Sequence, residues 1–182
     1  MSEPEKTMLR IPVNELDHVV GPTNATVVVV HYGDYQCPDC HRRHRAIQKV
    51  VDELVASVRL VYRHFPLVNV HPDALRAAEA AEVAAAQNKF WEMHRRLYTH
   101  PEKLGNRELR RHAQGIGLDL DRFDRDMASS TYADQILKNY YNSLTNGITG
   151  APTTFINGVL YPMSAVDLVK TVKAMLNKQK GS

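Results

Sequence analysis

Residues 25–40 of the chain read ATVVVVHYGDYQCPDC. The valines form an apolar, β-branched run without alternation, which is typical of a strand buried on both faces. Gly33 ends this run, and the pair Cys37 and Cys40 follows at the start of a segment whose apolar residues recur every three or four positions up to about Ala56. We therefore expect a buried strand, a tight turn that carries two cysteines, and an amphipathic helix in direct succession.

A second strand is predicted over residues 58–65, which are rich in β-branched and aromatic residues and are followed by Pro66. The order strand, helix, strand implies a right-handed parallel crossover. Because its valine run is the most apolar in the chain, the first strand is expected at the centre of the sheet.

The rest of the chain gives a hairpin and several helices. Two antiparallel strands, 153–156 and 159–161, are predicted on either side of Asn157-Gly158, a strong short-range hairpin signal. A terminal helix follows, with a predicted capping box over residues 164–167. The long segment between the second strand and the hairpin is expected to be helical and to begin with one helix over residues 73–96.

This order predicts an α/β protein with a small mixed sheet and an inserted helical domain. We divide the 182 residues into a flexible N-terminal arm (1–16) with a short extended piece near Val13, a sheet domain (17–66 and 147–182), and the inserted helices (67–146). The length suits one ordinary domain with an insertion.

Composition and charge exclude several classes of function. Hydrophobic residues make up 43% and charged residues 24%, as in globular proteins, and no apolar run approaches the roughly 20 residues of a membrane-spanning helix. The net charge is only +3 and the basic residues are dispersed, so neither nucleic acid nor a membrane is expected as a partner. Residues 1–12 lack the apolar centre of a secretion signal, which favours a cytoplasmic location.

Cys37 and Cys40 are the only cysteines, and a C-x-x-C spacing in a cytosolic chain indicates redox chemistry or a metal. At a helix start the two lie one turn apart, within disulfide range. Unpaired backbone N–H groups and the helix dipole favour a thiolate at Cys37, which is the predicted, exposed nucleophile. Cys40, inside the first turn, is the predicted resolving thiol. Pro38 fits the first turn because that position needs no N–H donor.

The neighbouring charges act on Cys37 in both directions. The basic run over residues 41–45 is expected to lower the pKa of Cys37 further, whereas Asp34 and Asp39 raise it. The arginines of this run are interpreted as a solvated face of the helix.

Metal-binding interpretations of the same stretch stay open. Cys37, Cys40, His41 and His44 form a Cys2His2 set for zinc or an iron–sulfur centre, although structural zinc sites usually draw their ligands from two separated loops. The string also matches the C-x-x-C-H attachment motif of c-type haem, which belongs mostly to exported chains. The rival function is therefore a non-catalytic metal-binding or peptide-binding module. We expect no metal and no cofactor.

Several motifs in one order resemble a known family. They are Gly33–Cys40, Arg63–Leu67, His71-Pro72, Phe90–His94 and Gly150–Gly158, within a match from about Asp17 to the terminal helix. Together they resemble the DsbA-like thioredoxin-fold oxidoreductases, in particular the group that also occurs fused to sodium/proton antiporters. The resemblance implies a thioredoxin fold with an inserted helical domain. It also implies a thiol–disulfide oxidoreductase that acts on protein or peptide thiols, with an unknown redox partner.

The resemblance assigns roles to individual residues. Cys37 is implied as the attacking thiol, Cys40 as the resolving thiol, and Pro152 as the cis-proline that faces the pair. Ala151 is implied to line the substrate groove, and Pro38 and Asp39, between the cysteines, are predicted to contact the same substrate.

Three residues depart from the family pattern. His31 stands six positions before Cys37, where relatives often carry an acid thought to handle the proton of the resolving thiol, so His31 is either that base or a packed core histidine. Asp39 replaces the His of strongly oxidising relatives, which predicts a milder oxidant. Ala151 replaces the usual Thr or Val. His71 and His94 match family positions and are interpreted as structural.

Overall fold

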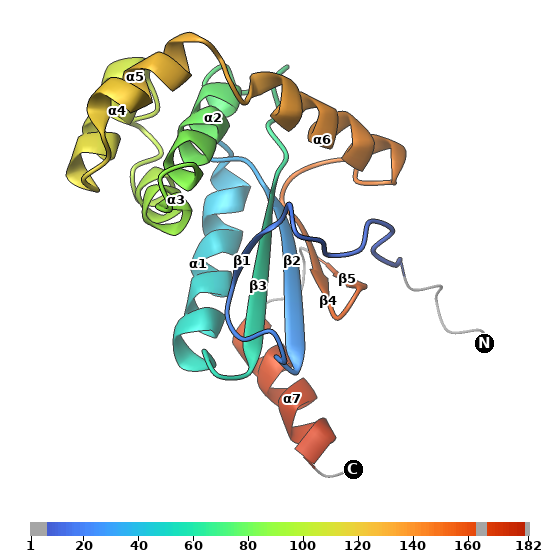
Figure 1. Cartoon of the computed structure of the whole chain (residues 1–182). Coiled ribbons are helices and arrows are strands. Elements are labelled where there is room, and N and C mark those ends of the chain that lie inside the picture. Colours follow the sequence, from blue (N-terminus) through green and yellow to red (C-terminus); the bar gives the residue numbers. More distant parts are fainter. Residues whose placement is uncertain (1–6, 163–166, 181–182) are drawn as a thin grey trace.

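The computed structural model describes residues 7–162 and 167–180, without the side chains of Gln179 and Lys180. In this part of the chain one mixed sheet has the strand order β1-β3-β2-β4-β5 (Figure 1). The strands are β1 (His18–Val20), β2 (Val27–Gly33), β3 (Val58–His64), β4 (Thr153–Ile156) and β5 (Val159–Tyr161). The predicted thioredoxin-fold sheet is thereby confirmed.

Strand β2 lies at the centre because it pairs on both edges. It runs parallel to β3 from Val27 opposite Val58 to Gly33 opposite His64, and antiparallel to β4 on its other side. Six of its seven residues are buried, as the uninterrupted valine run predicted. The parallel register brings the C-terminal ends of β2 and β3 to the same edge of the sheet, where the cysteine turn begins.

Seven helices accompany the described strands. They are α1 (Pro38–Glu53), α2 (Ala74–Ala85), α3 (Phe90–Thr99), α4 (Asn106–Gly115), α5 (Leu120–Ala128), α6 (Ala133–Thr145) and α7 (Leu168–Lys180). Apolar residues of α1 and α7 pack on one face of the sheet, and Tyr140 of α6 packs on the cluster that covers the other face. Figure 1 shows α2–α6 gathered beyond one end of the strands.

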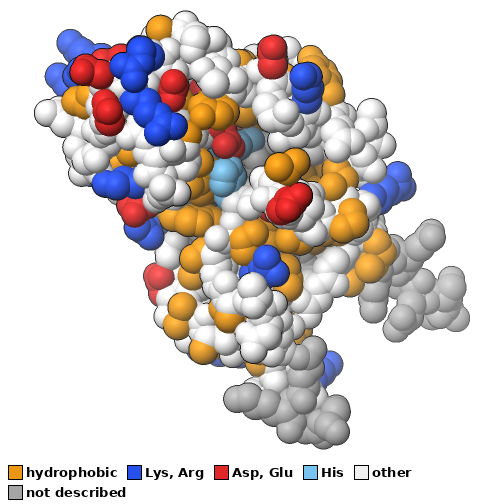
Figure 2. Space-filling view, viewed as in Figure 1, with side chains coloured by type: hydrophobic (Ala, Val, Ile, Leu, Met, Phe, Trp, Pro, Cys, Tyr) orange, Lys and Arg blue, Asp and Glu red, His pale blue; other side chains and the backbone are white. Residues whose placement is uncertain are grey.

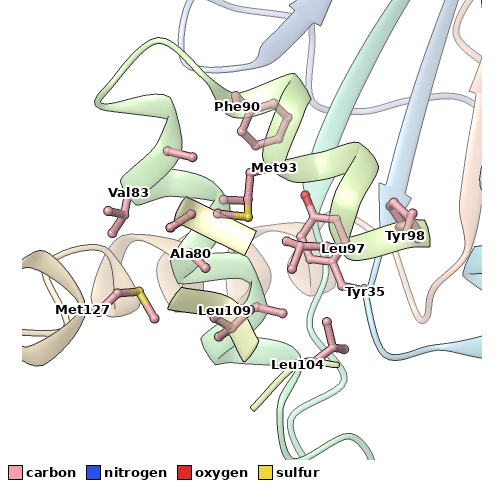
Figure 3. Close-up of a cluster of buried hydrophobic side chains, with 14 of the residues drawn as sticks. Tyr35, Ala80, Val83, Phe90, Met93, Leu97, Tyr98, Leu104, Leu109 and Met127 are labelled. Carbon is pink, nitrogen blue, oxygen red and sulfur yellow. The ribbon is translucent and has the colours of Figure 1, made fainter. Parts of the chain in front are cut away.

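The prediction of one continuous helix over residues 73–96 is wrong. The chain leaves α2 after Ala85, turns with Asn88 in the left-handed conformation (φ 59°), and starts α3 at Phe90. The turn lets α3 pack back on α2, so that Met93 and Leu97 enter the buried cluster shown in Figure 3. The alanine-rich sequence favours helix throughout, and only this tertiary packing selects the break.

The extended piece expected near Val13 is also placed wrongly. The first strand is β1, which pairs antiparallel with β3. A three-residue edge strand is too short to leave a periodic pattern, which explains why the sequence did not reveal it. Within the predicted arm, Thr7 and Leu9 exchange backbone hydrogen bonds of 2.9 and 2.7 Å with residues of the β4–β5 hairpin.

Most of the predicted capping box over residues 164–167 lies outside the described residues, and its last member, Asp167, accepts a 2.8 Å hydrogen bond from the Lys170 N–H. In the described part of the chain, none of the helices combines the length and the apolar character that crossing a bilayer requires.

Gly21 gives a prediction about stability. It has a φ of +102°, and a Cβ added there would lie 2.2 Å from the backbone oxygen of Val58. We expect Gly21→Ala to lower the free energy of unfolding by about 3 kcal/mol, since a left-handed penalty and a backbone clash add. Gly158→Ala is the control, because Gly158 also has a positive φ but its nearest contact is 3.7 Å away. We expect that change to cost about 1 kcal/mol. Equal costs in urea unfolding would contradict the close approach of Gly21 to β3.

Candidate active site

The cysteine turn follows β2 directly and starts α1. Cys37 is the N-cap of α1 with extended backbone angles, Pro38 is the first helical residue, and the backbone N–H of Cys40 donates a 3.4 Å hydrogen bond to the Cys37 sulfur. A sulfur in the N-cap position thus satisfies one of the N–H groups that a helix start leaves unpaired. The two cysteine side chains lie 3.2 Å apart and are free thiols.

The two sulfurs are more enclosed than the sequence suggested. Cys37 is only 6% exposed, so the expectation of an exposed thiol is wrong, and Cys40 is fully buried. The loop before β4 covers Cys37, since the carbonyl oxygen of Ala151 lies 3.8 Å from its sulfur. The Ala151–Pro152 peptide bond of this loop is cis. The loop that contains Ala151 and Pro152 therefore lies beside the Cys37 sulfur.

The surroundings drive the two thiols in opposite directions. A hydrogen bond from the Cys40 thiol, supported by the backbone N–H groups of Cys40 and Asp39, lowers the pKa of Cys37 to about 6 against the opposing effect of burial. Burial, together with the neighbouring Cys37, raises the pKa of Cys40 well above that of an ordinary thiol. At neutral pH the proton therefore stays on Cys40 and Cys37 is a thiolate.

The predicted lowering of the Cys37 pKa has the expected backbone N–H donors among its causes, but its largest cause, the hydrogen bond from the Cys40 thiol, was not part of the prediction. The causes are hydrogen bonds, and the charges of the basic run are not among them. Asp34 raises the pKa slightly, as expected, but the Asp39 carboxylate is half-exposed and forms an ion pair with Arg42. Solvent and this partner screen the Asp39 charge, so it has little effect on the sulfur.

The basic run is not a uniformly solvated face. Arg42 and Arg45 are exposed, but Arg43 is 5% exposed, donates a 3.1 Å hydrogen bond to the Pro162 carbonyl and lies over the Tyr161 ring. The interpretation is therefore wrong for Arg43. The helix turns this position toward β5, a placement that the local pattern of charges does not reveal.

The Cys2His2 interpretation finds little support in the geometry. The two ring nitrogens of His41 lie 2.6 and 3.0 Å from the backbone carbonyl oxygens of Tyr35 and Tyr98. His44 is stacked on the Tyr98 ring. With both nitrogens of His41 engaged, the four residues do not converge on one point as a metal requires.

Asp34 organises the turn, and sequence reasoning missed this role. Its buried carboxylate accepts hydrogen bonds from the backbone N–H groups of Gln36 and Leu67 and from the His71 ring, at 2.7, 2.9 and 2.8 Å. The backbone N–H of Asp34 donates a 3.4 Å hydrogen bond to the sulfur of Cys40. The placement of an Asp after a strand-ending Gly is the one signal of such a turn-forming carboxylate in the sequence.

His31 lies on β2 behind this turn and is 1% exposed. Its Nδ1 lies 3.1 Å from the Thr154 hydroxyl, and its Nε2 has no hydrogen-bond partner among the described residues. Burial, with the charges of His44 and Arg43, lowers the pKa of His31 to about 3. The ring is therefore neutral at physiological pH.

A layer of aromatic side chains encloses Cys40. Three tyrosines share its buried cluster: Tyr35, Tyr62 and Tyr98 (Figure 3 labels Tyr35 and Tyr98). The hydroxyl groups of Tyr62 and Tyr98 are 3.2 Å apart. The hydroxyl group of Tyr35 lies 3.0 Å from Nδ1 of His94. Burial raises the pKa of each tyrosine, so all three stay protonated. They come from the turn, β3 and α3, a distribution that no local sequence pattern reports.

A family model described as Thioredoxin matches residues 13–174. The Na(+)/H(+) antiporter NhaA 3 of Salinispora tropica is 43% identical over 151 residues, which are 82% of this chain and 23% of the antiporter. NhaA 1 of Mycobacterium sp. strain KMS is 37% identical over 181 residues, 96% of this chain and 30% of that protein. The chain thus spans about a quarter of the length of these curated relatives.

Solved structures share the whole fold. A thioredoxin-like oxidoreductase from Silicibacter pomeroyi is 27% identical with a TM-score of 0.76, covering 93% of this chain and 95% of that one. The thiol-disulfide exchange protein alpha-DsbA2 from Wolbachia pipientis also has a TM-score of 0.76, at 21% identity, covering 91% of this chain and 88% of its own.

The unequal thiols predict a pH dependence of alkylation. In the reduced protein we expect one cysteine, Cys37, to react with iodoacetamide, at a rate that is half-maximal near pH 6 and falls as the pH drops further. In Cys40→Ala the midpoint should rise toward the value of about 8.5 of an ordinary thiol, because the sulfur donor is lost. Asp39→Asn is the matched control and should leave the midpoint unchanged. A midpoint near 6 in Cys40→Ala would show that another group stabilises the thiolate.

Proposed function

Because the chain belongs to the thioredoxin family and shares its fold with DsbA-like proteins, we propose that it exchanges disulfides with protein or peptide thiols through Cys37 and Cys40. The observation that carries this proposal is the opposite shift of the two thiol pKa values at one helix start. Because only a thiolate attacks a disulfide, the ionised Cys37 is assigned the attacking role and the protonated Cys40 the resolving role.

The exchange balances in two steps. The Cys37 thiolate attacks one sulfur of a substrate disulfide; the substrate S–S bond breaks, a mixed disulfide forms, and the other substrate sulfur leaves as a thiolate. Cys40 then loses its proton and attacks the Cys37 sulfur, which releases the second substrate thiolate and closes the Cys37–Cys40 disulfide. Two electrons pass to the substrate. The reverse sequence oxidises a substrate dithiol, and the potentials of the two couples set the direction.

The loop at Ala151 and Pro152 is the proposed place for the substrate chain. It precedes β4 and lies against the Cys37 sulfur, so an extended segment bound along it would present its own sulfur to the nucleophile. Pro38 and Asp39 flank the same sulfur at the start of α1, and the Asp39 carboxylate is half-exposed. We propose that these four residues contact the substrate.

His31 is the proposed acceptor for the proton of Cys40. A Cβ on Gly33 would lie 2.5 Å from the Tyr98 hydroxyl and 3.1 Å from Nε2 of His31, so this unpartnered nitrogen faces the aromatic layer around Cys40. Burial makes the imidazolium unstable there. His31 therefore holds the proton only while the Cys40 sulfur attacks, and then passes it on.

The first test traps the mixed disulfide. Reduced protein is mixed with an excess of a short peptide that carries one disulfide, and adducts are measured by mass spectrometry. Cys40→Ser should accumulate one peptide adduct per chain, because nothing resolves it, and Cys37→Ser should form no adduct. Wild type is the control and should end as the internal disulfide. Equal adducts on both variants would refute the assigned roles, and the absence of any adduct would favour the non-catalytic module.

The second test concerns His31. In single-turnover experiments we expect His31→Ala to slow the decay of the mixed disulfide by about 100-fold, as is typical for loss of a general base, and to leave its formation rate unchanged. Thr154→Val is the matched control, because it removes the neighbour of Nδ1 and keeps Nε2 in place. If both steps slow together, His31 is a packing residue, and if neither changes, it has no part in the reaction.

A further inference from the structure

A second group of chemically reactive side chains lies away from the cysteines. A cavity of about 160 Å³ opens between the N-terminal segment, β1, β3, α2 and α6, and His18, His64 and Glu82 are among the residues that line it. Figure 2 shows histidine side chains beside a carboxylate in a hollow near the middle of this face. The proposed disulfide exchange uses none of these three residues.

The three side chains point their ligand atoms at one another. Oε1 of Glu82 lies 2.7 Å from Nε2 of His18 and 2.9 Å from Nε2 of His64. The three ligand atoms all lie within 4.8 Å of one another, and no other group of three such residues in the described chain meets that condition. They come from β1, α2 and the end of β3, so the fold rather than the local sequence brings them together.

The buried ring of His64 lacks a full set of hydrogen-bond partners in the part of the chain that the structure describes, and this calls for an explanation. His64 is 92% buried, and its Nδ1 has no hydrogen-bond partner among the described residues. Its Nε2 lies 2.9 Å from Oε1 of Glu82, so within the described chain the ring has a polar neighbour at one nitrogen and no hydrogen-bond partner at the other. Native proteins rarely leave a buried polar ring in this state, and an ion or a water molecule is a common reason when they do.

We propose that His18, His64 and Glu82 bind one divalent transition-metal ion, represented by zinc. Two imidazoles and one carboxylate are a donor set that zinc accepts, with bonds of about 2.0–2.2 Å to nitrogen and oxygen. Ligand atoms of a tetrahedral site are then about 3.4 Å apart, so the two contacts of Glu82, now 2.7 and 2.9 Å, would each lengthen by about half an ångström or slightly more. Calcium and magnesium, which prefer oxygen ligands, fit this set less well.

The cavity supplies the remaining coordination position. His18 and Glu82 are each about one-fifth exposed through it, so an ion has an entry path and a water molecule can complete the site. The metal would join β1 and β3 of the sheet to α2 of the inserted helices. Because the folded chain assembles the three ligands, metal binding is expected to stabilise the fold.

The test uses the oxidised protein, in which the Cys37–Cys40 disulfide keeps both thiols from binding metal. Zinc binding is measured by titration calorimetry, Co(II) binding by its visible absorption, and stability by thermal unfolding with and without metal. We expect one ion per chain and a higher Tm with zinc. His64→Gln and Glu82→Gln should lose both effects. His100→Gln is the control and should keep them, since His100 lies outside the cluster.

Two further measurements keep the result decisive. Each variant is first checked for a cooperative unfolding transition without metal, and His18→Gln, at the partly exposed member, replaces any variant that fails to fold. The Cys37→Ser/Cys40→Ser double variant should bind zinc as wild type does. No metal binding by the wild type, or binding that survives the loss of His64 and Glu82, would overturn the proposal. These outcomes do not depend on whether the protein exchanges disulfides.

Discussion

One proton held between two sulfurs is the constraint on which the site depends. The N-cap position gives Cys37 backbone donors, and the Cys40 thiol adds a third donor from one helical turn below. Burial keeps the proton on Cys40, so the ionised sulfur is the one near the surface. If the two thiols had equal surroundings, neither would have a defined role in exchange.

The fold maintains this inequality through residues far apart in the sequence. The parallel pairing of β2 and β3 sets the position of the turn, and the buried Asp34 carboxylate fixes the turn's shape through backbone N–H groups on both sides. Tyr98 of α3 helps to exclude water from Cys40. The inserted helices therefore contribute to the cysteine site: without α3, part of the apolar wall that keeps Cys40 protonated would be missing.

The sequence predicted what local patterns determine. The valine run, the C-x-x-C spacing with Pro38 and the Asn157-Gly158 turn each fix an element within a few residues, and they located β2, the start of α1 and the hairpin. The break at Asn88 and the burial of Arg43 depend on contacts with other elements, so the pattern around them was misleading. The direction of the Cys37 pKa shift was predicted correctly, but its cause was incomplete. The main donor is the Cys40 thiol, which stays protonated because of its burial and its neighbour Cys37, and neither is visible in the local sequence.

Buried polar groups separate structural from chemical roles in this chain. Asp34 has hydrogen-bond donors on both carboxylate oxygens, and His41 has a carbonyl oxygen beside whichever ring nitrogen carries the proton, so both groups hold the fold. His31 and His64 differ, since each has a buried ring nitrogen without a hydrogen-bond partner in the described chain. An unsatisfied buried nitrogen costs about 1–3 kcal/mol, so its presence in these two titratable rings favours a chemical role for them. The unpartnered nitrogen of His31 faces the tyrosine layer around Cys40, and the one of His64 belongs to a ring beside a carboxylate and a second imidazole, so the same reasoning leads to the proposed proton transfer at one and to the proposed metal binding at the other.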